Sequence, residues 1–570
     1  MAEPTSVPKG ETGEGPKPQP LSVEPGFGLA ADAWTRFRAR FLDPATAVQF
    51  PGEPVRPTVY VADTLLVRRN PSAPLDQTNL LDEVATRAGF DVVQEHSLDG
   101  ERRGLVEAGL PGERADELLS TWPVRVQLVR RSIADRVAPP SAPADAWQVL
   151  QAYRLAARTS ADEHDFVGLE HLVTAAAPGI GGTPYTSSHG IGGTPYTSSH
   201  GIGGTPYTSS HGVTGYGVPG LGGRQPVNWL GPVPRGQHGV DPNGPVRRPV
   251  VAVLDTGVAE HPWLDDGHVI RDPKVGNEPM SISAGVPDSE IGGVSDPLVG
   301  GLDPDAGHGT FIAGLIRQAC PDATVLAVRV FRGDGVVAEG DLLHALKLTA
   351  ARHLLALSGR KEYQAIDIVS LSLGYYHEQP ADSDFDRLLA EPLRLLARYG
   401  VAVVTAAGND ATVRPMYPAA MATYAADGTP PPADNAPLVS VGALNPDSSV
   451  ALFSNAGPWV RFHRPGASLV STHPRTFDAS MSPTAEFKAY DGSRRASIDP
   501  DDFSSGFAVW SGTSFAAPVF AGELAARLLD RFVEGDDSTD PRAASARAQK
   551  LVTDMKPVWS VDETEPKPGE

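Results

Sequence analysis

The stretch Gly512-Thr513-Ser514-Phe515-Ala516-Ala517-Pro518 is the part of the sequence that decides the fold. It places the hydroxyl of Ser514 at the start of a predicted helix, directly after two small residues. Such a hydroxyl is exposed, lies in the positive field of the helix N-terminus and leaves room for a substrate backbone. Pro518 falls in the first turn, where its missing N–H costs little. Taken alone, the stretch is more often a loop that caps a helix.

Two further motifs lie upstream of it. The apolar run Val250–Leu254 is followed by Asp255, which predicts a buried parallel strand with an acid at its carboxyl end. Open α/β sheets place their active sites at this edge. An Asp-Thr-Gly triplet also occurs in aspartic proteases, but these need a second copy in an all-β setting, and the sequence holds no second copy. In Gly307-His308-Gly309-Thr310, glycines flank a histidine and an apolar helix follows, although a lone histidine is more often structural.

The three motifs together resemble those of the subtilisin-like serine proteases, in the chain order Asp, His, Ser. The matching segments lie between residues 246 and 530. The resemblance implies that Ser514 is the nucleophile, that His308 is the general base and that Asp255 orients His308. It also implies that Asn409, in Ala406-Ala407-Gly408-Asn409, is the side-chain donor of the oxyanion hole.

The same resemblance implies which residues line the substrate cleft. Ser370–Gly374 resembles the segment that lies beside the substrate backbone, and Tyr417-Pro418 resembles the cis-proline turn of the family. The side chain of Met416 is expected to shorten the primary specificity pocket. Tyr375 stands where relatives often carry glycine, which indicates a narrower outer channel. The expected substrate-binding residues are Ser372, Leu373, Gly374, Ala407, Gly408 and Met416.

Charge and composition limit the partners of the protein. With 69 acidic and 48 basic residues the formal net charge is −21, which argues against binding to nucleic acid or to an anionic membrane. No secretory signal and no run long enough to cross a bilayer is visible. The sequence therefore predicts a cytoplasmic protein whose partners are protein or peptide substrates, and it allows intramolecular docking of the N-terminal domain.

No metal and no cofactor are expected. The connection Gly314–Ala323 is short, so the loop that forms a calcium site in many secreted relatives of the family is not expected here. The single cysteine, Cys320, excludes an intrachain disulfide and is interpreted as a small core or loop residue.

Alternating strand and helix patterns after residue 246 predict an α/β fold, with a mostly parallel sheet between helices on both faces in three layers. Before it, the order βαββαβ predicts a small α+β domain, with Gly104-Leu105-Val106 as a short strand. This order resembles a ferredoxin-like fold, the architecture of many subtilisin propeptides, and an unrelated accessory domain is equally compatible. The expected parts are a mostly disordered segment at 1–50, the α+β domain with an extra helix at 51–176, a flexible linker at 177–245, the catalytic domain at 246–535, and a helix with a disordered tail at 536–570.

The linker contains an identical repeat, Gly-Ile-Gly-Gly-Thr-Pro-Tyr-Thr-Ser-Ser-His, which begins at Gly179, Gly190 and Gly201. Its period is too short and too rich in glycine for a helical solenoid. A flexible linker is favoured, and a cleavage or recognition segment for the protease of the same chain is the alternative. Two insertions are notable in the catalytic half: an acidic, glycine-rich one at 277–306 and a long polar one at 473–505.

Two functions remain open at this point. The favoured one is a serine endopeptidase regulated by its N-terminal domain. The alternative is a catalytically silent scaffold that keeps the fold and binds peptides. The presence of Asp255, His308, Asn409 and Ser514 favours the enzyme, because sequence drift in a scaffold is expected to damage at least one of them.

Overall fold

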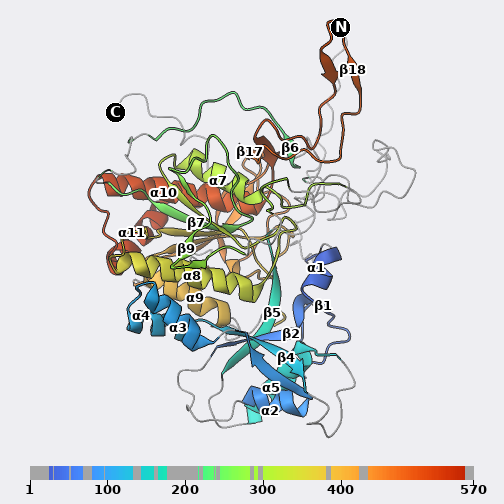
Figure 1. Cartoon of the computed structure of the whole chain (residues 1–570), viewed down its shortest axis with the longest axis vertical. Helices are drawn as coiled ribbons and strands as arrows, with labels where there is room; N and C mark the ends of the chain where they lie inside the picture. The colour runs from blue at the N-terminus through green and yellow to red at the C-terminus, as the bar shows by residue number, and fades with distance from the viewer. Residues whose placement is uncertain are drawn as a thin grey trace, which may run out of the picture.

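A computed structural model represents the fold of the chain (Figure 1). It describes residues 25–29, 31–50, 53–68, 80–95, 97–131, 143–159, 165–175, 216, 223–236, 238, 244, 246–282, 288–292, 300–379, 387–422 and 434–558. The three repeats predicted as part of a linker lie outside the described residues.

The part of the chain from residue 246 on, which the sequence predicts to be catalytic, is called the catalytic half below. It is built on a seven-stranded sheet in the order β16-β15-β14-β13-β7-β11-β8, and neighbouring strands in it are parallel. Its central strands are apolar and buried along their length, as is typical of a parallel sheet covered on both faces. The strands are β7 (Val250–Asp255), β8 (Val269–Ile270), β11 (Thr324–Arg329), β13 (Ile368–Leu371), β14 (Ala402–Ala406), β15 (Leu438–Leu444) and β16 (Val460–Pro465).

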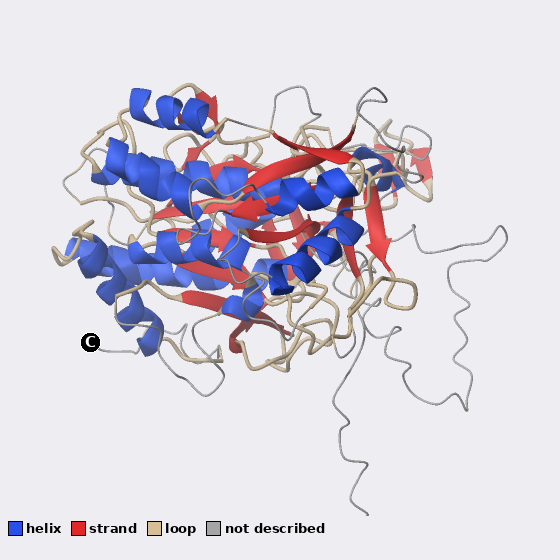
Figure 2. Cartoon of the chain, turned by 90° about the horizontal axis from the view of Figure 1, so that it is seen from below, coloured by secondary structure: helices blue, strands red, loops and turns tan. Residues whose placement is uncertain are grey.

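Alternate residues of β7 point into two different cores. Val251 and Val253 pack with α7 (His308–Ala319) and α10 (Thr513–Val533), whereas Val250, Ala252 and Leu254 pack with α8 (Glu339–Leu357) and α9 (Arg387–Arg398). Figure 1 shows the strands between these two helical layers, and Figure 2 gives the view from below with helices in blue and strands in red. The predicted three-layer α/β fold is therefore confirmed. A C-terminal helix, α11 (Pro541–Asp554), adds Leu551 and Val552 to the core on the α10 side.

Shorter elements complete this half, and β6 (Gln225–Pro226) joins them from before residue 246. They are β9 (Lys274–Val275), β10 (Glu278–Pro279), β12 (Val336–Ala338), the 3₁₀ turn η2 (Ala419–Met421), β17 (Leu469–Thr472), β18 (Glu486–Lys488), β19 (Arg494–Ala496) and β20 (Phe507–Trp510). The β18–β19 hairpin, which belongs to the insertion at 473–505, projects away from the rest (Figure 1). Among the described residues, none of the helices combines the length and the apolar character that crossing a bilayer requires.

The N-terminal domain has an antiparallel sheet in the order β5-β2-β4-β3. Its strands are β2 (Thr58–Arg68), β3 (Phe90–Gln94), β4 (Val124–Arg130) and β5 (Phe166–Thr174). The helices α2 (Leu80–Arg87) and α5 (Ala146–Thr159) share one core with this sheet, and α3 (Leu98–Glu107) and α4 (Gly112–Thr121) are inserted between β3 and β4. A βαββαβ order is present, but it is made by other elements than expected: β2, α2, β3, β4, α5 and β5 form it, and α3 and α4 are both inserted.

Three expectations for the parts outside the catalytic core are wrong. Residues 31–50 are not disordered, because α1 (Ala31–Arg36) is followed by β1 (Ala39–Leu42), which pairs with β2. Gly104-Leu105-Val106 is not a strand but the last turn of α3, where Leu105 faces the core and its neighbours face solvent. Part of the predicted linker is also structured, since β6 pairs with β20 and the buried Arg224 donates to the Ala306 carbonyl at 2.7 Å.

The inserted helices join the two domains. Leu105 and Trp122 of the N-terminal domain lie in the same buried cluster as Leu346 of α8. The indole Nε1 of Trp122 donates to the carbonyl of Leu343 at 2.7 Å. On the other side, β5 pairs with β12 of the catalytic half, so the two domains share both an apolar core and a strand pairing.

We expect Trp122→Ala to lower the free energy of unfolding by about 3–5 kcal/mol, because it leaves a cavity in this shared core and removes the hydrogen bond from the indole to the Leu343 carbonyl. Urea unfolding followed by circular dichroism measures the change. Leu155→Ala, at a side chain 54% exposed, is the matched control and should change stability by less than about 0.5 kcal/mol. Equal effects of the two variants would contradict a joined core.

Candidate active site

Asp255 and His308 come together at the carboxyl end of β7. Asp255 is the last residue of the strand and His308 is the first residue of α7. The Nδ1 atom of His308 lies 2.8 Å from Oδ1 and 3.0 Å from Oδ2 of Asp255, and both side chains are buried. Burial disfavours the imidazolium, but the carboxylate of Asp255 outweighs it and raises the pKa of His308. With Nδ1 on the carboxylate, Nε2 is the atom free to accept a proton.

Ser514 is the second residue of α10, and its neighbour Phe515 has its ring 5.1 Å from the ring of His308. The Ser514 hydroxyl donates to the carbonyl of Ala175 at 3.0 Å, with the Ser372 carbonyl as a second acceptor at 3.4 Å. Within the described residues, Nε2 of His308 has no hydrogen-bond partner. The serine hydroxyl is therefore turned toward residue 175 and not toward the histidine.

Asn409 lies beside the start of α10. Its Oδ1 atom accepts hydrogen bonds from the backbone N–H and from the hydroxyl of Thr513, each at 2.8 Å. These two bonds fix the orientation of the amide, so the NH₂ group is the end that remains to donate. The hydroxyl of Thr513 also accepts from the N–H of Gly408 at 3.1 Å, which ties the predicted Ala407–Asn409 segment to the serine helix.

A strand of the N-terminal domain occupies the space in front of these groups. Thr174 and Gly374 exchange two backbone hydrogen bonds of 3.0 Å, and the N–H of Ala175 donates to the Gly335 carbonyl at 2.8 Å. On the other side, Leu172–Thr174 pairs antiparallel with β12. The end of β5 thus lies between β12 and the Gly374 segment, in the position that the resemblance gives to a substrate backbone.

The other predicted cleft residues lie around this strand. Ser372 donates through its hydroxyl to the carbonyl of Ser514 at 2.8 Å, and Leu373 is buried behind it. A Cβ atom at Gly374 would meet Cε of Met416, and one at Gly408 would meet Sδ of Met416. The Met416 side chain therefore lies close to both glycines.

The sequence reasoning missed Glu290, in the insertion at 277–306. Its buried carboxyl is hydrogen-bonded to the hydroxyl of Thr256 at 2.5 Å and to that of Thr310. Thr256 connects the two carboxyl groups, because its N–H donates to Oδ1 of Asp255 at 2.8 Å and its hydroxyl bonds Glu290. Glu290 therefore lies behind Asp255. Burial raises the pKa of Glu290 to about 8, and the two threonine hydroxyls oppose this only in part. Glu290 follows no motif, so only its acidic neighbourhood could have pointed to it.

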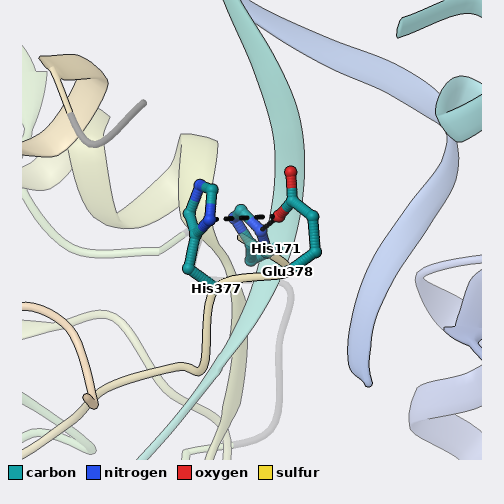
Figure 3. Close-up of side chains that lie close together, drawn as sticks. All are labelled: His171, His377 and Glu378. Carbon is teal, nitrogen blue, oxygen red and sulfur yellow. Dashed lines mark hydrogen bonds and ion pairs between the residues drawn. The ribbon is translucent and has the colours of Figure 1, made fainter. Parts of the chain in front are cut away.

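Two groups among the described residues have three ligand atoms within 4.8 Å of one another, as a metal site requires. Asp478, Asp499 and Asp501 form one of them, in the polar insertion. The other consists of His171, His377 and Glu378 (Figure 3). In that group Nδ1 of His377 already accepts the N–H of Gln379 at 3.0 Å, so it is not free for a metal.

We expect Glu290→Gln to gain stability relative to the wild type as the pH rises. The folded-state pKa of about 8 lies above the ordinary value of 4.5, so the stabilisation from protonated Glu290 is complete below pH 4.5 and is lost as the pH rises through 8. Glutamine cannot lose a proton. The difference in free energy of unfolding should shift by on the order of 3 kcal/mol between pH 5 and pH 8, measured by urea titration.

The control for this experiment is Glu534→Gln, at an exposed side chain, whose stability should follow that of the wild type at both pH values. A constant difference between Glu290→Gln and the wild type across this range would show that Glu290 titrates as an ordinary carboxyl.

Comparison with known proteins places the chain among proteases. A family model described as the subtilase family matches residues 247–547, more than half of the 570 residues. Subtilisin BL of Lederbergia lenta is 27% identical over 244 residues, which are 41% of this chain and 70% of that protein. The subtilase-type proteinase psp3 of Schizosaccharomyces pombe is 27% identical over 242 residues, 42% of each chain. The major intracellular serine protease of Bacillus subtilis is 26% identical over 239 residues, 39% of this chain and 60% of that one.

Among solved structures, fervidolysin from Fervidobacterium pennivorans, a keratinolytic enzyme related to subtilisin, covers 87% of this chain and 57% of its own, at 17% identity and a TM-score of 0.39. The chain thus spans less than two thirds of several of the proteins that it matches.

Proposed function

Since this chain belongs to the subtilase family of serine endopeptidases, we propose that it hydrolyses peptide bonds through Asp255, His308 and Ser514. The observation that carries this proposal is the buried pair of Asp255 and His308, with an Nδ1–Oδ1 distance of 2.8 Å. This pairing leaves Nε2 of His308 available beside the helix that begins with Thr513 and Ser514.

In the proposed reaction, the Ser514 hydroxyl attacks the carbonyl carbon of the substrate and its proton passes to Nε2 of His308. Asp255 holds the imidazole by Nδ1 and stabilises the imidazolium that forms. The NH₂ group of Asn409 and the backbone N–H of Ser514 bind the developing oxyanion. His308 then returns the proton to the leaving amine, and a water molecule releases the acyl group by the same steps.

We expect Ser514→Ala to lower peptide hydrolysis on the order of 10⁶-fold without lowering the melting temperature, because only the nucleophile is removed. His308→Ala should be nearly as damaging, since the three residues act as a unit. Turnover of a fluorogenic peptide measures both. Ser504→Ala, at an exposed serine, should retain activity.

Labelling with a fluorophosphonate probe separates the enzyme from the silent scaffold. Wild-type chain that binds peptides but neither reacts with the probe nor turns over substrate would support the scaffold and overturn the proposed reaction.

The N-terminal domain is proposed to limit access to this site. The support is the strand at Leu172–Ala175, which uses the backbone groups of Gly335 and Gly374 that a substrate would need. The Ala175 carbonyl also accepts the hydrogen bond of the Ser514 hydroxyl, at 3.0 Å. A substrate can enter only after this strand has left. The position of the Met416 side chain further supports a preference for small side chains in the primary pocket. The cytoplasmic location remains a prediction.

We expect Thr174→Pro to raise basal peptide hydrolysis by about tenfold or more. Proline has no N–H to donate to the Gly374 carbonyl, so the docked strand loses one of its hydrogen bonds and its fit in the cleft. Thr174→Ala keeps the backbone bond and is the matched control. Initial rates on an unstructured peptide give the comparison. Unchanged rates for Thr174→Pro would mean that the N-terminal domain does not limit access.

A further inference from the structure

A buried polar cluster lies where β5 leaves the N-terminal domain and enters the cleft. The imidazole of His171 lies between two carboxylates, with Nδ1 2.8 Å from Oε2 of Glu339 and Nε2 2.9 Å from Oε2 of Glu378 (Figure 3 shows the second contact). All three side chains are buried. Ionised carboxylates only accept hydrogen bonds, so between two of them both ring nitrogens carry a proton and the His171 side chain is a cation.

The balance of charge agrees with this assignment. Burial by itself lowers the pKa of His171, but the bonds to Glu339 and Glu378 outweigh it and raise the pKa to about 10. Arg154 provides a second cation, with Nη2 3.0 Å from the other oxygen of Glu378. Burial lowers the pKa of His377 to about 4, which leaves that ring neutral. Two carboxylates therefore face two cations, and the cluster needs no metal ion to be neutral.

The two charges come from different domains. His171 in β5 and Arg154 in α5 belong to the N-terminal domain, whereas Glu339 at the start of α8 and Glu378 after β13 belong to the catalytic half. When the N-terminal domain leaves the cleft, it takes both of these cations with it, because Arg154 lies on α5 and His171 on β5. The catalytic half then keeps two carboxylates at the wall of the cleft without the cations that pair with them here.

The two carboxylates face one defined residue of the docked strand, His171. Leu172 pairs with Ala338, so His171 is opposite Glu339 in the same register, four residues before Ala175. The ring of Tyr375, the residue after Gly374, stacks on the His171 ring with centroids 4.4 Å apart and planes at 16°. A cavity of about 10 Å³ beside His171 is lined on the catalytic side by Glu339, Tyr375, His377 and Leu388.

We propose that Glu339, Glu378 and Tyr375 form a cation-binding subsite of the cleft. In a bound substrate, the residue whose carbonyl lies at the Ser514 hydroxyl corresponds to Ala175. The subsite selects substrates with arginine or lysine four residues before that residue, at the position that His171 occupies in the intact chain. The proposal rests on the proposed peptidase function. Arginine suits the subsite best, because its planar guanidinium can stack on the tyrosine ring while its N–H groups bond both carboxylates. A neutral side chain would leave two partly buried carboxylates without a counter-charge, which is costly.

The first experiment uses the chain's own strand as the ligand and needs no turnover. In full-length chain carrying Ser514→Ala, hydrogen exchange is measured at the amides of Thr174 and Ala175 for His171→Arg and His171→Gln. The arginine variant should exchange within about twofold of the parent, and the glutamine variant at least about tenfold faster. His238→Gln removes an exposed histidine paired with Asp530 and should have no effect. Protection of the His171→Gln strand equal to that of the parent would overturn the subsite.

The second experiment lets two peptides compete for the wild-type full-length chain. They are identical except for arginine or its neutral analogue citrulline at the position equivalent to His171. The ratio of their cleavage rates equals the ratio of kcat/KM and does not depend on how much enzyme has a free cleft. Arginine should be favoured by at least about tenfold, lysine less, and Glu339→Gln with Glu378→Gln should remove the preference. Equal consumption of both peptides would overturn the subsite alone.

The two proposals can fail separately. If no peptide is cut above the rate of Ser514→Ala, the proposed peptidase function fails, and the exchange experiment still decides whether the pocket needs a cation.

Discussion

The arrangement of the whole molecule depends on one strand that pairs with segments of both domains. Strand β5 pairs with β2 inside the N-terminal domain, and its last residues pair with β12 and Gly374 in the catalytic half. Backbone hydrogen bonds of this kind allow one register at a time, so they determine how the two domains meet. The same register brings the Ala175 carbonyl to the Ser514 hydroxyl and His171 to Glu339.

At this interface the apolar contacts contribute mainly to stability, and the ion pairs mainly to the choice of strand register. The packing of Trp122 against α8 removes apolar surface from water and is the larger source of stability. The ion pairs of His171 with Glu339 and Glu378 add less net free energy, because three charged groups lose their hydration. They do penalise any other register of β5, which would leave buried carboxylates unpaired. Behind the site, Glu290 adds a further buried carboxyl, which stays protonated near neutral pH and so spares Asp255 a second negative charge.

Much of the catalytic half could be predicted because its signals are local. Two apolar runs, which end in Asp255 and in Ala406, form strands β7 and β14 of the parallel sheet. Both strands end at the same edge, and the predicted residues lie together there. The pairing of Asp255 with His308 and the anchoring of Asn409 to Thr513 follow from this geometry. The segment Phe166–Thr174 was not recognised as a strand, although it is largely apolar, because it stands alone before a repeat and shows no partner in the sequence.

The sequence alone thus determined the fold class of the catalytic half, the candidate catalytic residues and the small α+β domain before them, since each depends on patterns within about 20 residues. Only the tertiary structure decided what occupies the cleft, why Glu290 lies behind Asp255, and that His171 is a cation. Each of these depends on groups far apart along the chain, such as Ala175 and Ser514, or His171 and Glu378. Their charge and position are set by burial and by long-range strand register, which no local pattern encodes.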